Sequence, residues 1–197
     1  IDDCKTYGFD YLGFAYYSAK PLASKEVIYD LYYIGRNKAN DGRMEQMHRL
    51  NGILTKENVN ANINILEGGF WNRRNPFFHS MHNNKDSNIT KINKPASYDQ
   101  VLNDVMQSNC ILELLQNGQQ QQSARYFEAI CYNKKLLTNN TNISSLPYYN
   151  PKYMKYFATV EDIDWDWVKR KESVEYHYKG DFSPLRMIEQ IDKSFAE

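Results

Sequence analysis

The sequence predicts an α/β fold in which helices cover both faces of a mostly parallel sheet. Strand-like and helix-like stretches alternate along the chain, the strands are short apolar runs, and Gly or polar residues follow most of them. Strands that alternate with helices form βαβ units, whose strands run parallel. The 197 residues suffice for one large domain or two small ones.

The amino-terminal half contains two predicted strands around one helix. Residues 27–34 are β-branched and aromatic and stop at Gly35, which predicts a strand. A helix follows over residues 41–57. Its apolar side is made by residues three or four apart: Met44, Met47, Leu50 and Leu54. Residues 62–66 form the second short strand.

The pattern repeats in the second half. Ser97 can cap one helix and Ser123 another, and Pro184 opens a terminal helix. Further strands are expected at residues 110–115, 136–137 and 153–157. The first of these helices has a predicted buried stripe of Val101, Leu102, Val105 and Met106. We expect the apolar side of the terminal helix to face inward: Leu185, Ile188, Ile191 and Phe195.

These elements divide the chain into three predicted parts. Residues 1–26 are a lead-in segment, residues 27–182 form the α/β domain, and residues 183–197 form a carboxyl-terminal helix. Residues 70–96 lack a period and are rich in Asn, Lys and Arg, so we expect an excursion there. The chain opens at Ile1 without an initiator Met, so we expect part of the working protein upstream.

Composition bounds the class of function. Lys+Arg and Asp+Glu are equal at 24 each, which gives no basic field for nucleic acid. The three cysteines lack metal-ligand spacing, and an odd count argues against a disulfide framework, which favours a reducing compartment. No apolar run reaches the ~18 residues of a membrane-spanning helix. We therefore expect a cytoplasmic protein, free or peripherally associated with the inner face of the membrane.

One stretch runs from a buried strand through a polar loop into a helix. The apolar run ends at Leu115, Gln119 lies in the loop, and the helix begins at Ser123. The first backbone N–H groups of a helix lack intrahelical partners and attract anions. In an open α/β sheet this end lies beyond the carboxyl ends of the strands, where ligands bind. The stretch therefore predicts a diphosphate site.

Two motifs invite a metal interpretation that we do not adopt. His79 and His82 have no third ligand in sight, so solvated loop histidines are the better interpretation. Asp162, Asp164 and Asp166 precede a basic stretch, and this order complements a helix dipole without any ligand. We interpret the acidic triplet as a helix start and predict no metal site.

Several pieces of the chain follow one another in a characteristic order. They are Tyr29-to-Lys38, Cys110-to-Leu114 with Gln119, Arg125-x-x-Glu128-Ala129, Lys134-to-Asn140, and Tyr148-Tyr149-Asn150-Pro151. In order and spacing they resemble bacterial glycosyltransferases of surface-polysaccharide and lipopolysaccharide biosynthesis. The resemblance implies the carboxyl-terminal, donor-binding half of a GT-B architecture, with a Rossmann-like nucleotide-sugar-binding domain here and the acceptor-binding half upstream.

This resemblance implies a nucleoside-diphosphate sugar as donor, a glycan or lipid-linked acceptor, and no cofactor. Arg125, with Arg36 or Lys38 after the first strand, is a cationic candidate for the diphosphate, because Arg can form a fork to phosphate oxygens. Glu128, one turn after Arg125, can accept hydrogen bonds from ribose or sugar hydroxyls. The other polar candidates are Gln119, Ser123, Thr138, Asn139 and Asn140.

Alternatives stay open for these residues. Arg125 and Glu128 can instead form a local surface pair, and residues 138–140 also read as turn chemistry. The family loop usually carries Gly-Gln-x-Gly and then Thr, whereas residues 118–123 here read Gly-Gln-Gln-Gln-Gln-Ser. Either side-chain amides replace backbone donors or the site is degenerate. A degenerate site would make the chain a non-catalytic α/β interaction domain.

Overall fold

The computed structural model describes residues 6–7, 17–36, 42–66, 88–119 and 121–196. The chain divides into two compact units. The larger unit, Ala23–Tyr176, contains the sheet, and the smaller unit combines Ile1–Leu22 with His177–Glu197.

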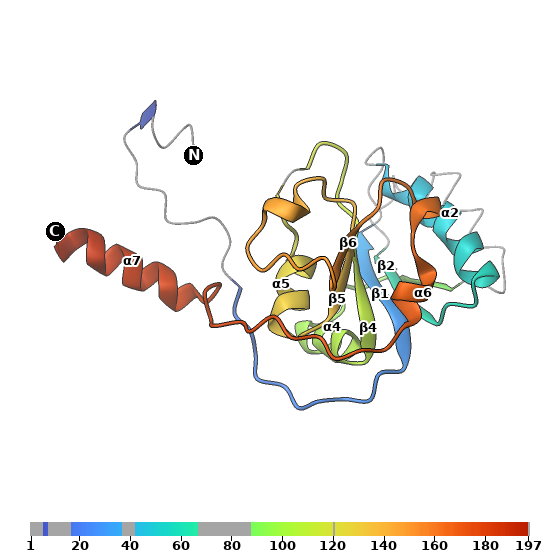
Figure 1. The fold of residues 1–197 in the computed structure, drawn as a ribbon, viewed down its shortest axis with the longest axis horizontal. Helices are drawn as coiled ribbons and strands as arrows, with labels where there is room; N and C mark the ends of the chain where they lie inside the picture. Colours follow the sequence, from blue (N-terminus) through green and yellow to red (C-terminus); the bar gives the residue numbers. More distant parts are fainter. Residues whose placement is uncertain (1–5, 8–16, 37–41, 67–87, 120, 197) are drawn as a thin grey trace. The chain divides into compact units, whose positions relative to one another are not determined.

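The larger unit is built on a six-stranded, all-parallel sheet in the order β3-β2-β1-β4-β5-β6 (Figure 1). The strands are β1 (Tyr29–Arg36), β2 (Ala61–Leu66), β3 (Ile89–Ile92), β4 (Ser108–Glu113), β5 (Lys135–Thr138) and β6 (Met154–Tyr156). The α/β class with a mostly parallel sheet is confirmed. The sequence did not predict β3, which is a four-residue edge strand within the 70–96 interval and too short to show a period.

Helices cover both faces of the sheet (Figure 1). One face carries α2 (Arg43–Lys56), α6 (Trp165–Lys169) and the 3₁₀ turn η3 (Val160–Asp162). The other carries α4 (Tyr98–Met106) and α5 (Ala124–Cys131), and a second 3₁₀ turn, η2 (Ile143–Ser145), follows β5. The predicted cap of α4 is confirmed, because Ser97 accepts a hydrogen bond from the Gln100 N–H at 3.2 Å.

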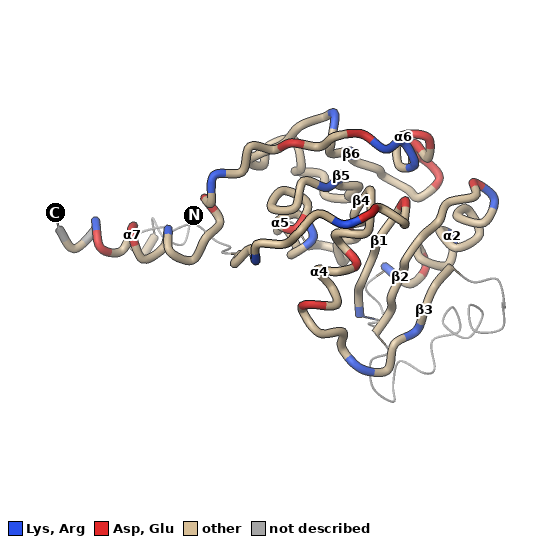
Figure 2. The backbone as a smooth tube through the Cα atoms, turned by 90° about the horizontal axis from the view of Figure 1, so that it is seen from below, with Lys and Arg blue, Asp and Glu red and all other residues tan. Residues whose placement is uncertain are grey.

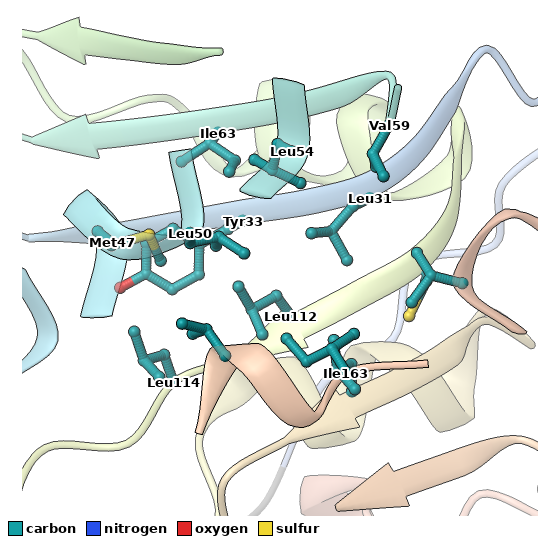
Figure 3. Packing of buried hydrophobic residues seen from close by; sticks show 14 of the residues in the cluster. Leu31, Tyr33, Met47, Leu50, Leu54, Val59, Ile63, Leu112, Leu114 and Ile163 are labelled. Carbon is teal, nitrogen blue, oxygen red and sulfur yellow. The ribbon is translucent and has the colours of Figure 1, made fainter. Parts of the chain in front are cut away.

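A contiguous apolar core lies between the sheet and the α2/α6 layer (Figure 3). Alternate residues of β1 point to opposite faces, so Leu31 and Tyr33 enter this core while Tyr32 does not. The predicted stripe of α2 is confirmed, since all four residues are buried: Met44, Met47, Leu50 and Leu54. Trp167 of α6 also packs in this core.

The α4/α5 face is more polar. Tyr32, Ile111 and Leu136 are aligned across neighbouring strands, and Glu113 and Thr138 form the next aligned pair toward the carboxyl ends. The predicted stripe of α4 is largely confirmed: Val101, Leu102 and Val105 are buried and Met106 is half-buried. Near the carboxyl ends of these strands, the α4/α5 face therefore carries a carboxylate and a hydroxyl, whereas the opposite face carries aliphatic side chains.

The smaller unit ends in α7 (Pro184–Ala196). The expectation that its apolar side faces inward is wrong for Leu185, Ile188 and Phe195, which are 66%, 50% and 86% exposed. Their spacing predicts which side of the helix is apolar, but it does not predict which element, if any, packs against that side. None of the helices in the described residues is long and apolar enough to cross a membrane. Figure 2 shows acidic and basic residues interspersed along the backbone.

Candidate functional site

The winding of the sheet reverses between β1 and β4, which are neighbours although two strands separate them in sequence. In such sheets, ligands bind at the carboxyl ends of the strands that flank the reversal. The chain segments that follow β1 and β4 come close together here. Gly42 has φ 77°, and a Cβ there would lie 2.6 Å from the side-chain nitrogen of Asn117. The positive φ favours glycine, and a Cβ would force the Asn117 side chain to move.

Glu113, the last residue of β4, connects the elements at this edge of the sheet. Its side chain is 0% exposed. Its Oε1 accepts hydrogen bonds from the Ser123 backbone N–H at 2.9 Å and the Ser123 hydroxyl at 2.8 Å, and its Oε2 accepts one from the Thr138 hydroxyl at 2.6 Å. These three bonds replace much of the hydration that burial of the carboxylate removes.

Each of the two hydroxyls that donate to Glu113 also accepts a backbone hydrogen bond. The Ser123 hydroxyl accepts from the Arg125 N–H at 3.2 Å and so caps α5, which confirms the predicted helix start. The Thr138 hydroxyl accepts from the Asn140 N–H at 3.0 Å. One carboxylate therefore holds the first turn of α5 and the end of β5 in a single network.

Asn139 joins the ends of β4 and β5. Its Oδ1 accepts from the Leu115 N–H at 2.7 Å, and its Nδ2 donates to the Leu115 carbonyl at 3.3 Å. Asn140 is buried, and its Oδ1 accepts from the Asn142 N–H at 3.0 Å. Asn140 thus makes the turn contact that the open alternative anticipated, whereas Asn139 links the ends of two strands.

Arg125 and Glu128 form an ion pair on one side of α5. The Arg125 Nη1 lies 2.5 Å from the Glu128 Oε2, and the two side chains are 15% and 1% exposed. Burial raises the pKa of the Glu128 carboxyl to about 7, and the Arg125 guanidinium opposes this rise. Arg125 and Glu128 therefore do pair with each other, as the alternative of a local pair stated, but the pair is buried and does not lie on the surface.

Tyr32 of β1 lies beside this pair. The Arg125 guanidinium carbon is 5.9 Å from the centre of the Tyr32 ring, within cation–π range. Burial raises the pKa of the Tyr32 hydroxyl, and the carboxylates of Asp104 and Glu128 raise it further against the opposing effect of Arg125. The hydroxyl therefore stays neutral around pH 7.

Two of the predicted binding residues are exposed at the carboxyl edge. Arg36 is exposed at the end of β1, and its carbonyl accepts a hydrogen bond from Arg43 Nη2 at 3.1 Å. Gln119 is exposed in the β4–α5 loop and donates from Nε2 to the Gln121 carbonyl at 3.2 Å. Lys38 lies outside the described residues.

The acidic triplet starts helical turns, as predicted. Asp162 forms a capping box with Thr159 at η3, and Asp164 caps α6 by accepting from the Trp167 N–H at 3.0 Å. Within the part of the chain that the structure describes, no group of three His, Cys, Asp or Glu residues is arranged to hold a metal ion. His79 and His82 lie outside that part.

A hollow of about 390 Å³ lies between the end of α2 and the η3–α6 segment. Its lining combines four acidic residues with one lysine and three apolar residues: Glu57, Glu161, Asp164, Asp166, Lys56, Ile53, Ile163 and Trp165. This excess of carboxylates disfavours a diphosphate, which makes the carboxyl edge of β1 and β4 the better candidate site.

The strand order and the helices on both faces define a Rossmann-like α/β domain. A crystal structure of TarM is similar to this chain with a TM-score of 0.55 and 13% identity, over 90% of this chain and 35% of that one. This similarity shows the fold alone, a Rossmann-like α/β domain, and the chain spans about a third of that structure's length.

A second crystal structure is similar over 86% of this chain and 40% of its own, with a TM-score of 0.46 and 9% identity. It is that of a UDP-forming alpha,alpha-trehalose-phosphate synthase from Burkholderia xenovorans. No protein-family model and no curated protein sequence matches the chain.

Glu113, Tyr32 and Asn117 were not predicted from the sequence as site residues. Glu113 did leave a signal, because it is a single acidic residue inside the apolar run 110–115. A charge in a fully buried strand needs partners, and these are placed by residues far along the chain. Tyr32 and Asn117 leave no comparable signal, since tyrosines and asparagines are frequent throughout the sequence.

Proposed function

We propose that this chain is the donor-binding domain of a glycosyltransferase that moves a sugar from a nucleoside-diphosphate sugar to a cell-surface polysaccharide or lipid-linked acceptor. The observation that carries the proposal is the Rossmann-like sheet, similar to part of TarM, which reverses between β1 and β4 and has polar and cationic groups at that edge. Open α/β sheets bind nucleotides at this position.

Charge stabilisation is the main chemical task at such a site. Departure of the sugar leaves negative charge on the diphosphate, and positioned cationic groups stabilise it. Arg36 and Lys38 after β1, with Arg125 on α5, supply this charge in our proposal. The mechanism uses no cofactor, and its general base comes from outside this chain's candidate residues.

The remaining candidates have two proposed roles. Gln119 and Asn139, which are not fully buried, hydrogen-bond to hydroxyls of the donor. Ser123, Thr138 and Asn140 hold the shape of the site through Glu113. Glu128 orients Arg125 and reaches ribose or sugar hydroxyls when the pair opens.

The partners follow from the same proposal. A second Rossmann-like domain binds the acceptor, since two such domains face each other in a GT-B enzyme. The reaction takes place in the cytoplasm, or at the inner face of the membrane when the acceptor is lipid-linked.

Calorimetric titration with a panel of nucleoside diphosphates tests the proposal. At least one is expected to bind the unaltered chain, and Arg36→Ala is expected to weaken that binding about tenfold or more, because a charge-assisted contact to phosphate is lost. Arg36 is exposed, so the variant should keep its melting temperature. Arg49→Ala is the matched control, since Arg49 is an exposed arginine paired with Glu161. Equal affinity in the two variants contradicts the proposal.

One observation favours a second candidate, a non-catalytic α/β interaction domain. The Ser123 and Thr138 hydroxyls and the Arg125 guanidinium are all engaged with side chains of the protein. In that case no nucleoside diphosphate raises the melting temperature, whereas a ligand at 100 times its Kd would add about 2.7 kcal/mol and raise it by several degrees.

A further inference from the structure

A carboxylate of the protein itself already accepts hydrogen bonds at the start of α5. Glu113 is fully buried, and its Oε1 accepts both the backbone N–H and the hydroxyl of Ser123. The Ser123 hydroxyl in turn accepts the Arg125 N–H. Two backbone donors at the start of the helix are thus engaged directly or indirectly by one carboxylate, which also complements the positive end of the helix dipole.

We infer that Glu113 is a buried anion of the protein that excludes the donor's diphosphate from the first turn of α5 and confines it to the β1 side of the carboxyl edge. The inference rests on the proposed function and deepens it, because it distinguishes between the cationic candidates. Arg36, exposed at the end of β1, contacts the diphosphate. This narrows the proposed function, because Arg125 then stays paired with Glu128 and neither residue of the pair contacts the donor. Glu113 is a positioning residue, since its carboxylate is fully buried and acts through Ser123 and Thr138.

The charges around α5 support this assignment. Two buried carboxyl groups and one guanidinium lie at α5: Glu113 accepts from Ser123 at the start of the helix, and Glu128 pairs with Arg125 in its first turns. Like charges repel strongly when they are partly removed from water, and salt screens such pairs little. A diphosphate entering the first turn of α5 would meet this excess of acid. On the β1 side it would meet Arg36 and Arg43, which lie together through the bond from Arg43 to the Arg36 carbonyl.

The rigidity of the network strengthens the exclusion. Glu113 cannot turn away without also breaking the hydrogen bond that it accepts from the Thr138 hydroxyl at 2.6 Å. The same hydroxyl accepts a hydrogen bond from the Asn140 N–H. Moving the carboxylate therefore means breaking bonds at β5 as well as at α5. An incoming phosphate cannot displace one contact at a time.

Titration with inorganic pyrophosphate, which carries no base or sugar, tests the inference directly. Glu113→Gln removes the charge and keeps the shape, so it is expected to bind pyrophosphate about tenfold more tightly than the unaltered chain. Glu113→Asp keeps the charge and shortens the side chain, so no gain is expected. Glu161→Gln, an exposed glutamate on η3, is the matched control and should change affinity less than about twofold. Equal or weaker binding by Glu113→Gln overturns the inference.

Amide hydrogen exchange in the unaltered chain gives a second test that does not depend on whether the variants fold. Millimolar pyrophosphate is expected to leave exchange at Ala124 and Arg125 unchanged, and slowing at these amides overturns the inference. Failure of the proposed function has a different signature, in which no nucleoside diphosphate binds the unaltered chain. A gain of pyrophosphate binding in Glu113→Gln would then still support the role of Glu113.

Discussion

The two faces of the sheet are packed by different means. The α2/α6 face is held by a contiguous apolar cluster drawn from five strands and both helices. A charged side chain enters it at Lys135, whose amine donates to the Trp167 carbonyl at 2.8 Å and pairs with Glu172 at 3.2 Å. The α4/α5 face instead buries Tyr32, Glu113 and Glu128 beside its aliphatic side chains.

The difference separates stability from positioning. Apolar packing has no direction and stabilises in proportion to the area removed from water. Buried charges stabilise little in net terms, because desolvation offsets their attraction, but they are costly to displace once paired. The α2/α6 face therefore provides stability, and the α4/α5 face fixes the side chains at the carboxyl edge of the sheet.

The largest expected effect lies on the apolar face. Trp167→Ala removes a buried ring that packs in the core and donates from Nε1 to the Lys152 carbonyl at 3.0 Å. We expect a loss of about 3–5 kcal/mol in the free energy of unfolding, measured with urea. Tyr156→Ala, at an exposed position on β6, is the control and should cost less than about 1 kcal/mol. A similar cost for both would show that this face is not the source of stability.

The second effect is a pH dependence on the polar face. The pKa of Glu128 rises from 4.5 in the unfolded chain to about 7 in the fold, so its favourable contribution is complete below pH 4.5 and is lost as the pH rises through 7. Between pH 4 and pH 8 this amounts to a loss of about 3 kcal/mol. Urea unfolding across this range should show the loss in the unaltered chain.

Glu128→Gln provides the comparison, because the amide does not titrate. Its free energy of unfolding should vary less with pH over the same interval. Identical pH profiles for the two proteins would mean that Glu128 is not the titrating group.

A smaller effect is expected from Thr138→Val, which keeps the shape and removes the hydroxyl. Glu113 loses a donor and the Asn140 N–H loses its acceptor, so we expect a cost of about 1–3 kcal/mol. Thr90→Val, at an exposed position on β3, should be nearly neutral. Amide exchange at Asn140 should rise in Thr138→Val alone, and unchanged exchange there would contradict the network.

The smallest effect concerns the cap of α4. Ser97→Ala removes the acceptor of the Gln100 N–H and should lower the free energy of unfolding by about 1 kcal/mol. The Arg125–Glu128 pair lies on the neighbouring helix, so nucleotide binding by the folded protein should stay the same. A change in affinity would show that α4 also positions the site.

Local patterns in the sequence determined most of the fold. The apolar spacing of α2, the caps at Ser97 and Ser123, and the acidic start of α6 depend on residues a few positions apart, which the sequence displays directly. The sequence did not predict an element that was too short to show a hydrophobic period, and it did not predict the packing partner of an apolar helix side. This explains the missed strand β3 and the wrong prediction for the apolar side of α7.

The site residues divide in the same way. The sequence alone indicated that Ser123, Arg125 and Thr138 lie at the carboxyl edge of a parallel sheet, because that follows from element order. It could not show that Glu113 binds both hydroxyls or that the Arg125–Glu128 pair is buried, since Glu113 meets partners 10 and 25 residues away. Such contacts depend on strand register and helix docking, which only the tertiary structure decides.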